Sequence, residues 1–225
     1  MNATIIPIRL AVSNVFAVRA EKTIIVDSSN PGNGQRILDR LARHGIQPRD
    51  ISLIFLTHGH MDHFGSAPEL RQLTGAPIAL HPGDADMVRA GRNLEMQPTG
   101  LQGRLLAPLF RQQIAPFEPD IWLDEGFDLS AYGVTGRIIA TPGHSPGSVS
   151  LLLPDGNALV GDLLRGGHLG GALLPHQPEY AYFYDDFAQM QRSIHEFMRL
   201  KPRRLYVGHG GPLDSDAVTR RFNNQ

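Results

Sequence analysis

The residues best suited to chemistry form one cluster, Thr57-His58-Gly59-His60-Met61-Asp62-His63, which directly follows the apolar run 51–56. Imidazole nitrogens and carboxylate oxygens bind borderline divalent metals such as zinc, and catalytic sites keep one coordination position open for water. Histidine is scarce, with 10 among 225 residues, so a surface loop that is His-rich by chance explains the cluster poorly. The pattern predicts a metal site where a buried strand reaches the surface.

Three further strand ends carry the same residue types. The strands expected over 137–140, 158–160 and 205–207 are each followed by glycine and a lone histidine or aspartate: His144, Asp162 and His209. Open sheets bind ligands beyond the carboxyl ends of their strands, and glycine there lets the backbone pass close to a bound group. We therefore expect the loops to converge and to supply seven ligands: His58, His60, Asp62, His63, His144, Asp162 and His209.

Seven ligands exceed what one zinc ion needs and suit two divalent ions, with zinc favoured and iron or manganese as alternatives. The predicted partition gives one ion His58, His60 and His144. The other ion receives Asp62, His63 and His209. Asp162 is expected to bridge the two ions, because a carboxylate has two oxygens. Asp62 is also the predicted catalytic residue, since its carboxylate can orient a nucleophile or accept its proton.

Around these loops the chain alternates strand and helix patterns, which predicts an α/β fold. Strands are expected over 4–12, 14–19, 22–27, 51–56, 77–80, 127–131, 137–140, 148–153, 158–160 and 204–207. Helices are expected from 37 to a stop at Gly45 and over about 65–73, 84–90, 185–200 and 216–222. The turn 154–157 predicts a hairpin, and the glycine-rich run 166–171 is expected to be a flexible loop.

Composition limits the classes of function. A hydrophobic share of 41% and a charged share of 19% suit one folded domain over 1–225. A formal net charge of −1 favours a small-molecule substrate over nucleic acid or an anionic membrane. The absence of cysteine excludes disulfides, thiolate ligands and a cysteine nucleophile. With neither a signal-peptide pattern nor a long apolar run, the sequence predicts a soluble cytoplasmic protein; it carries no indication of oligomeric state.

The segment 83–119 differs from its surroundings. It combines one expected helix with many glycines and prolines, yet apolar residues remain frequent. Long irregular segments in compact domains are often functional. Two interpretations stay open: a lid insertion over the site, or a helical hairpin packed on the core.

The ordered set of ligand motifs, 58–63, Gly143-His144, Gly161-Asp162 and Gly208-His209, resembles the metallo-β-lactamase superfamily. The resemblance implies an αββα four-layer sandwich with mixed sheets, helices on the outer faces and a dinuclear site at one edge. The same ligand partition is implied. Asp27 matches a position that supports the ligand loops from behind, although an aspartate capping a turn is the alternative.

Asp162 narrows the choice within the superfamily. The true β-lactamases lack an aspartate at this position, so the resemblance favours thioesterases, lactonases and a short glyoxalase-II-like branch. Too few residues follow His209 for the C-terminal helical domain of longer glyoxalase II members. Arg165 stands where the quorum-signal lactonases have tyrosine, which weakens that assignment. The RNA-processing branch needs a large inserted domain for which the chain has no room.

The expected activity is hydrolysis of an acyl ester, thioester or lactone by a hydroxide that bridges two metals. The alternative is an oxidoreductase similar to the persulfide dioxygenases, with one Fe(II) held by His58, His144 and Asp162. A non-catalytic relative is disfavoured by the intact ligand set.

Three residues are candidates for substrate binding, each with a structural alternative. Arg165 suits a substrate carboxylate, but an arginine commonly forms a surface salt bridge. His168 can donate to a substrate oxygen, but a solvent-exposed loop histidine is the more common case. Tyr182, within the aromatic run 180–184, suits a pocket wall or packing at the start of a helix.

Overall fold

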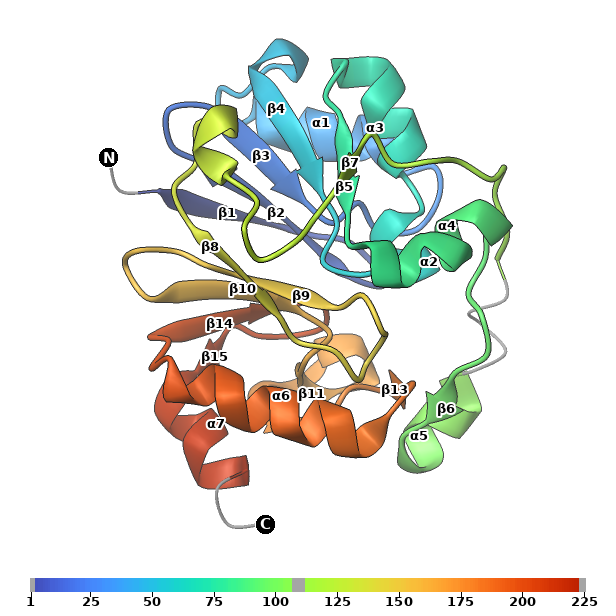
Figure 1. Ribbon diagram of the computed structural model, residues 1–225, viewed down its shortest axis with the longest axis vertical. Coiled ribbons are helices and arrows are strands. Elements are labelled where there is room, and N and C mark those ends of the chain that lie inside the picture. Colours follow the sequence, from blue (N-terminus) through green and yellow to red (C-terminus); the bar gives the residue numbers. More distant parts are fainter. Residues whose placement is uncertain (1–2, 107–111, 223–225) are drawn as a thin grey trace.

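The computed structural model describes residues 3–106 and 112–222. Two β-sheets face each other, and helices cover their outer faces, which gives four layers (Figure 1). This is the αββα sandwich expected from the sequence.

The first sheet has six strands in the order β1-β2-β3-β4-β5-β7. Their bounds are Thr4–Arg9, Asn14–Arg19, Thr23–Val26, Ile51–Phe55, Ile78–Leu80 and Ile121–Trp122. Strands β1 to β3 pair antiparallel, whereas β3, β4, β5 and β7 pair parallel. Helices α1 (Gly34–Ala42) and α3 (Ala67–Thr74) lie on the outer face (Figure 1). Gly75 ends α3 in the left-handed conformation, with φ 74°.

The second sheet has five strands in the order β15-β14-β10-β9-β8. Their bounds are Leu213–Asp214, Arg204–Val207, Asn157–Gly161, Val149–Leu152 and Arg137–Ala140. Strands β10 and β14 pair parallel, and the other pairs are antiparallel. Helices α6 (Phe187–Arg199) and α7 (Ser215–Phe222) cover this sheet (Figure 1). The predicted hairpin at 154–157 joins β9 and β10, and Gly156 has φ 82° there.

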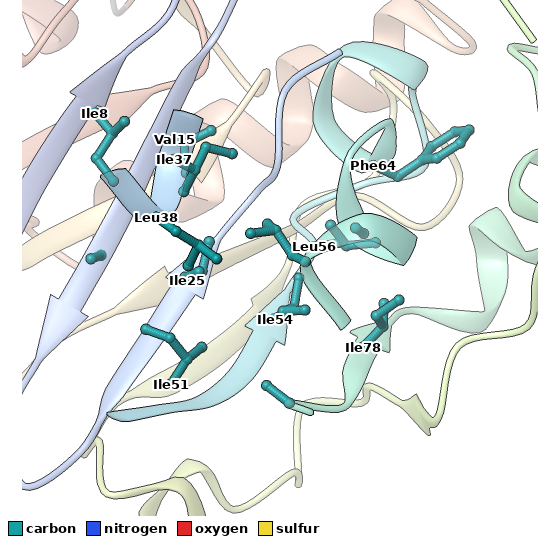
Figure 2. Close-up of a cluster of buried hydrophobic side chains, with 14 of the residues drawn as sticks. Ile8, Val15, Ile25, Ile37, Leu38, Ile51, Ile54, Leu56, Phe64 and Ile78 are labelled. Atoms are coloured by element: carbon teal, nitrogen blue, oxygen red, sulfur yellow. The ribbon is translucent and has the colours of Figure 1, made fainter. Parts of the chain in front are cut away.

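The hydrophobic core lies on both faces of the first sheet. Ile25 of β3 packs with Ile37 and Leu38 of α1 (Figure 2). The alternate residues Ile24 and Leu53 point to the other side and pack between the sheets. Because central parallel strands are buried on both faces, they read as continuous apolar runs.

Two local predictions are wrong. Residues 127–131 do not form a strand: a 3-10 helix spans Leu129–Tyr132, and the Asp128 side chain accepts a hydrogen bond from the Ser130 N–H at its start. The run 166–171 is not a free loop, because β11 (Arg165–His168) pairs with β12 (Leu173–Glu179). A Cβ on Gly166 would lie 2.0 Å from the Pro175 carbonyl oxygen, so glycine serves close backbone approach here.

The segment 83–119 leaves the first sheet after β5, contacts the second half of the molecule through β6 (Gln97–Pro98), and returns to the first sheet at β7. Helix α4 (Ala85–Ala90) packs on the first half through Met87 and Val88. Strand β6 pairs with β13 (Phe183–Tyr184), which precedes α6. Helix α5 (Gly100–Leu106) follows β6, and residues 107–111 lie outside the described residues. The lid interpretation stays a prediction. Within the described ranges, no helix has the length and apolar character needed to cross a bilayer.

Candidate metal centre

All seven predicted ligands lie at one edge of the sandwich, beyond the ends of β4, β8, β10 and β14. Asp62 and His63 belong to the one-turn helix α2 (Met61–Phe64), and the other five lie in loops. Strands β8, β10 and β14 run in the same direction, so their carboxyl ends meet. The Gly208 N–H donates to the Gly161 carbonyl at 2.9 Å, and this bond holds the loops of Asp162 and His209 side by side. The Val149 N–H donates to the Thr57 carbonyl at 2.8 Å, which joins the first sheet to the second.

One group of buried histidines consists of His58, His60 and His144, here the three-histidine cluster. The His144 Nε2 lies 3.1 Å from the His58 Nε2 and 2.8 Å from the His60 Nδ1. The His144 Nδ1 donates to the Phe183 carbonyl at 2.8 Å, so its Nε2 carries a lone pair. Burial, together with neighbouring imidazoles, lowers the pKa of His58 and of His60 well below the usual range. The rings are therefore neutral, which is the form that binds metal.

A second group consists of Asp62, His63 and His209, here the aspartate cluster. The His209 Nε2 lies 3.2 Å from the Asp62 Oδ2, and the His63 Nε2 lies 3.8 Å from the same oxygen. Hydrogen bonds on the side away from the site hold the rings of His63 and His209 in place. The His63 Nδ1 donates to Asp27 at 2.8 Å, and the His209 Nδ1 donates to the Val12 carbonyl at 2.8 Å. These bonds point both Nε2 atoms at the site, as in carboxylate–histidine–metal triads.

Asp162 lies between the two groups. Its Oδ1 is 3.4 Å from the His63 Nε2. Its Oδ2 is 3.2 Å from the His209 Nε2 and 3.8 Å from the His144 Nε2. One carboxylate thus contacts ligands of both clusters, which is the arrangement that a bridging ligand requires.

The donor set fits divalent metal ions. The His63 Nε2 and the Asp162 Oδ1 are buried and have no hydrogen-bond partner among residues 3–106 and 112–222. Burial lowers the pKa of His63, but nearby carboxylates, Asp27 first among them, outweigh it and raise this pKa to about 10. Despite the same opposition from burial, Asp162 raises the pKa of His209 well above its usual value. In the absence of metal, protons on the His63 and His209 rings therefore supply the positive charge that the neighbouring carboxylates favour. A bound metal ion would supply this charge and replace the protons.

Asp27 supports the first ligand loop directly. Its carboxylate accepts hydrogen bonds from the Thr57 N–H at 2.8 Å and the Thr57 hydroxyl at 2.9 Å, in addition to the His63 ring. It is 1% exposed and has φ 62°. The structure therefore places Asp27 behind the ligands instead of at a surface turn.

Asp84 is a residue that the sequence analysis missed as part of the site, since it read this position only as a helix start. Its buried carboxylate bonds to the loops after β4 and β8. Burial raises its pKa, although three hydrogen bonds oppose that effect. The sequence did contain a pattern that could have identified Asp84. This residue closely follows β5, which pairs parallel with β4 in the first sheet, and a polar residue beyond the end of a parallel strand is a candidate site residue.

Of the three predicted substrate contacts, Tyr182 lies beside His209 of the centre and Arg165 lies on the Tyr182 ring, whereas the side chain of His168 contacts Gln102. Arg165 is 8% exposed, so the surface salt bridge considered for it is wrong. Its Cζ lies 4.2 Å from the Tyr182 ring centroid, and its Nε and Nη1 have no hydrogen-bond partner within the described parts of the chain. The buried Tyr182 hydroxyl accepts from the Gly170 N–H at 2.8 Å, and its ring lies 5.9 Å from that of His209. The half-buried His168 Nδ1 lies 3.2 Å from the Gln102 Nε2.

A cavity of about 150 Å³ opens beside the three-histidine cluster. His60 and His144 form part of its wall. Apart from Gly83 and Ser145, the other lining residues are apolar or acidic: Met87, Leu94, Met96, Pro146, Asp84, Asp86, Glu95 and Asp185. The wall suits a neutral or partly apolar group better than an anion.

Comparison with known proteins decides the family. The model of the metallo-β-lactamase superfamily matches residues 8–209. The chain belongs to the metallo-β-lactamase superfamily. It is 26% identical over 221 residues to the probable metallo-hydrolase YflN of Bacillus subtilis, covering 90% of this chain and 82% of that protein. Membership confirms the resemblance inferred from the ligand motifs.

Two further superfamily comparisons bear on chemistry. The chain is 27% identical over 177 residues to the hydroxyacylglutathione hydrolase GloC of Haemophilus influenzae, covering 78% of this chain and 77% of that protein. TTHA1623, whose crystal structure is of a di-iron-bound form, superposes with a TM-score of 0.67 at 23% identity, over 97% of this chain and 98% of that one. The latter likeness establishes the shared fold. Superfamily membership and the histidine and aspartate clusters together imply divalent metal ions for this chain.

Metal removal is expected to lower thermal stability. Without cations, the lone pairs of the His58 and His144 Nε2 atoms face each other at 3.1 Å with no positive charge between them. The buried carboxylates then have only the protonated His63 and His209 rings as counter-charges. A ligand at 100 times its Kd stabilises a native state by about 2.7 kcal/mol, which corresponds to about 5–10 °C in Tm for a domain of this size. Differential scanning calorimetry of chelator-treated and reconstituted protein measures the shift; an equal Tm in both would contradict metal binding at this centre.

Proposed function

We propose that this superfamily member is a dinuclear-metal hydrolase of small acyl esters, thioesters or lactones. The position of Asp162 carries the proposal, because its two oxygens contact His63 and His209 on one side and His144 on the other. The superfamily relatives named metallo-hydrolases support a metal-dependent hydrolytic reaction. The similarity to hydroxyacylglutathione hydrolase GloC supports a thioester among the substrates.

The residues that would hold the ions are the two clusters with Asp162 between them. Two bound divalent ions would supply an ionised water as nucleophile and would polarise the substrate carbonyl. Asp62 is the catalytic residue of the proposal: its carboxylate accepts the proton of the nucleophile or orients it. Its contact with the His209 ring, at 3.2 Å, holds the carboxylate toward the centre. The ligand residues are at most 6% exposed, which limits the access of bulk water to the centre.

Substrate recognition is assigned to Arg165 and Tyr182, with His168 at the rim. The Arg165 guanidinium lies on the Tyr182 ring, and two of its donors are unpaired within residues 3–106 and 112–222. Buried donors are nearly always paired in native proteins, so an anionic substrate group is the partner we assign. An acyl group without charge would occupy the cavity beside His60 and His144.

An Arg165→Met variant tests this assignment. A hydrogen bond to a charged group contributes about 1.5–3 kcal/mol, so kcat/KM for a carboxylate-bearing thioester should fall about 10- to 150-fold. The value for a matched neutral thioester should change less than about threefold, since Met retains most of the packing on Tyr182. Steady-state kinetics on the substrate pair measures the ratio, with the exposed Arg199→Met as control. An equal loss on both substrates contradicts charge recognition.

Metal content per chain, with a substrate panel, tests the proposed function. Mass spectrometry of protein purified without added metal should give two divalent ions per chain, with thioester or lactone hydrolysis by the same sample. One iron per chain with oxygen consumption on a persulfide would favour the oxidoreductase, since His58, His144 and Asp162 offer two imidazoles and a carboxylate. Metal-loaded protein that turns over neither class of substrate would contradict the proposal.

A further inference from the structure

A carboxylate without a part in the proposed reaction lies beside the three-histidine cluster. Asp84 is 1% exposed and follows β5 at the end of a 3-10 turn, Pro82–Asp84. Its Oδ2 accepts hydrogen bonds from the Gly59 N–H and the Ser145 hydroxyl, both at 2.7 Å. Its Oδ1 accepts from the Gly147 N–H, also at 2.7 Å. One side chain therefore ties the loop after β4 to the loop after β8.

Three glycines allow the loops to approach this carboxylate. A Cβ on Gly59 would lie 2.7 Å from the Asp84 Cβ, and one on Gly147 would lie 2.6 Å from the Asp84 backbone nitrogen. A Cβ on Gly83 would lie 2.8 Å from the Gly147 nitrogen. Separations below about 3 Å are not tolerated in close-packed interiors. A side chain at any of the three positions would push the loops apart, so the sequence keeps them in contact around Asp84.

The contacts of Asp84 concern one cluster only. Gly59 lies between His58 and His60 in the chain, and Ser145 directly follows His144. The aspartate cluster has separate supports, because Asp27 and the Val12 carbonyl fix the rings of His63 and His209. None of the hydrogen bonds described for the Asp84 carboxylate reaches the loops after β10 or β14.

We infer that Asp84 is the positioning residue of the three-histidine cluster, and that its loss weakens metal binding there while sparing the aspartate cluster. The inference rests on the proposed function, since it assumes that the cluster binds a metal ion. The physical reason is geometric: His60 and His144 lie on loops from different elements, and charge-assisted bonds to one buried carboxylate set the distance between them. Asp84 acts through the loops and does not touch the reacting atoms.

An Asp84→Asn variant tests the inference. The amide retains the shape of the side chain but replaces one acceptor by a donor, so at least one loop donor loses its partner. Metal-free protein is titrated with Co²⁺ against a competing chelator, which yields a Kd for each ion. Loss of a supporting contact typically costs 10- to 100-fold in metal affinity, so one Kd should rise by that factor and the other should stay within about twofold.

Paramagnetic NMR of the Co²⁺ protein identifies the affected cluster. The exchangeable ring N–H resonances of the three-histidine cluster should weaken at partial loading, whereas those of His63 and His209 should remain. Asp86→Asn is the matched control, because Asp86 is an exposed carboxylate on α4 that lines the same cavity; we expect unchanged affinities. Ser145→Ala removes one of the three hydrogen bonds to Asp84 and should give a smaller rise of the same Kd. This variant keeps the inference testable if Asp84→Asn does not fold.

The two proposals are judged on separate data. Fewer than two ions on the wild-type chain contradicts the dinuclear function without reference to any variant. The role of Asp84 is judged on the ratio of variant to wild-type Kd for an ion at the three-histidine cluster. A ratio below about threefold overturns it, as does an equal weakening of both ions with a matching fall in the Tm of the metal-free protein, which would indicate a general structural role.

Discussion

Replacing His58 by alanine is expected to lower kcat by at least about 100-fold, equivalent to about 2.7 kcal/mol or more of transition-state stabilisation at 1.36 kcal/mol per tenfold change. The His58 Nε2 lies 3.1 Å from the His144 Nε2 and, as a neutral ring, has its lone pair available for an ion. Alanine leaves two histidines in that cluster, fewer than the three protein ligands typical of catalytic zinc. Steady-state kinetics with a thioester, at saturating metal, measures the loss.

The histidine at position 44 provides the control. His44 is exposed near the end of α1 and its side chain belongs to neither cluster. His44→Ala should retain full activity and metal content. Activity retained by His58→Ala at the wild-type level would overturn the metal mechanism as a whole, because the three-histidine cluster could then not serve the reaction.

Replacing Asp162 by alanine is expected to lower metal content and activity together. Its carboxylate contacts both clusters: Oδ1 lies 3.4 Å from the His63 Nε2, and Oδ2 lies 3.2 Å from the His209 Nε2 and 3.8 Å from the His144 Nε2. Burial opposes its charged form, yet His209 and His63 hold the pKa of Asp162 well below its usual range, so the carboxylate is ionised. Its removal should reduce bound metal from two ions to one or fewer per chain and kcat by at least about 100-fold.

Mass spectrometry and kinetics on one preparation separate the outcomes. Asp39→Asn, on the exposed face of α1, controls for loss of a carboxylate without effect on the centre. Two ions per chain in Asp162→Ala, with near wild-type activity, would contradict a bridging role. Two ions per chain with strongly reduced activity would indicate that Asp162 acts in the reaction and does not bind metal, which would contradict its assignment as the bridging ligand.

The ligand loops were predictable because the residues that identify each loop are adjacent in the sequence. A run of apolar residues followed by glycine and then a histidine or aspartate marks a strand end at a ligand edge. Strands β8 and β14, which precede His144 and His209, have the predicted bounds 137–140 and 204–207. The partition into two clusters also followed from ligand chemistry, and the structure brings the same residues together. The fold class followed from the alternation of strands and helices.

The secondary structure of two segments, 166–171 and 127–131, was not predictable from local sequence patterns. The glycines of 166–171 read as a flexible loop, but β12, several residues later, pairs with them. Likewise the segment 127–131 carries apolar residues suited to a strand, whereas an aspartate side chain at its start stabilises a 3-10 turn instead. In both places tertiary or side-chain contacts override the local preference.

The sequence by itself indicated the α/β class and the set of candidate ligands, because residue type and spacing encode them directly. The sandwich fold was implied by the resemblance of the ligand motifs to the superfamily. Only the tertiary structure decided which ring nitrogen of each histidine faces the centre, since that depends on bonds to distant groups such as Asp27 and the Phe183 carbonyl. It also decided the roles available to Arg165 and Asp84. Burial and hydrogen-bond partners are properties of packing between segments far apart in the chain, and no local pattern records them.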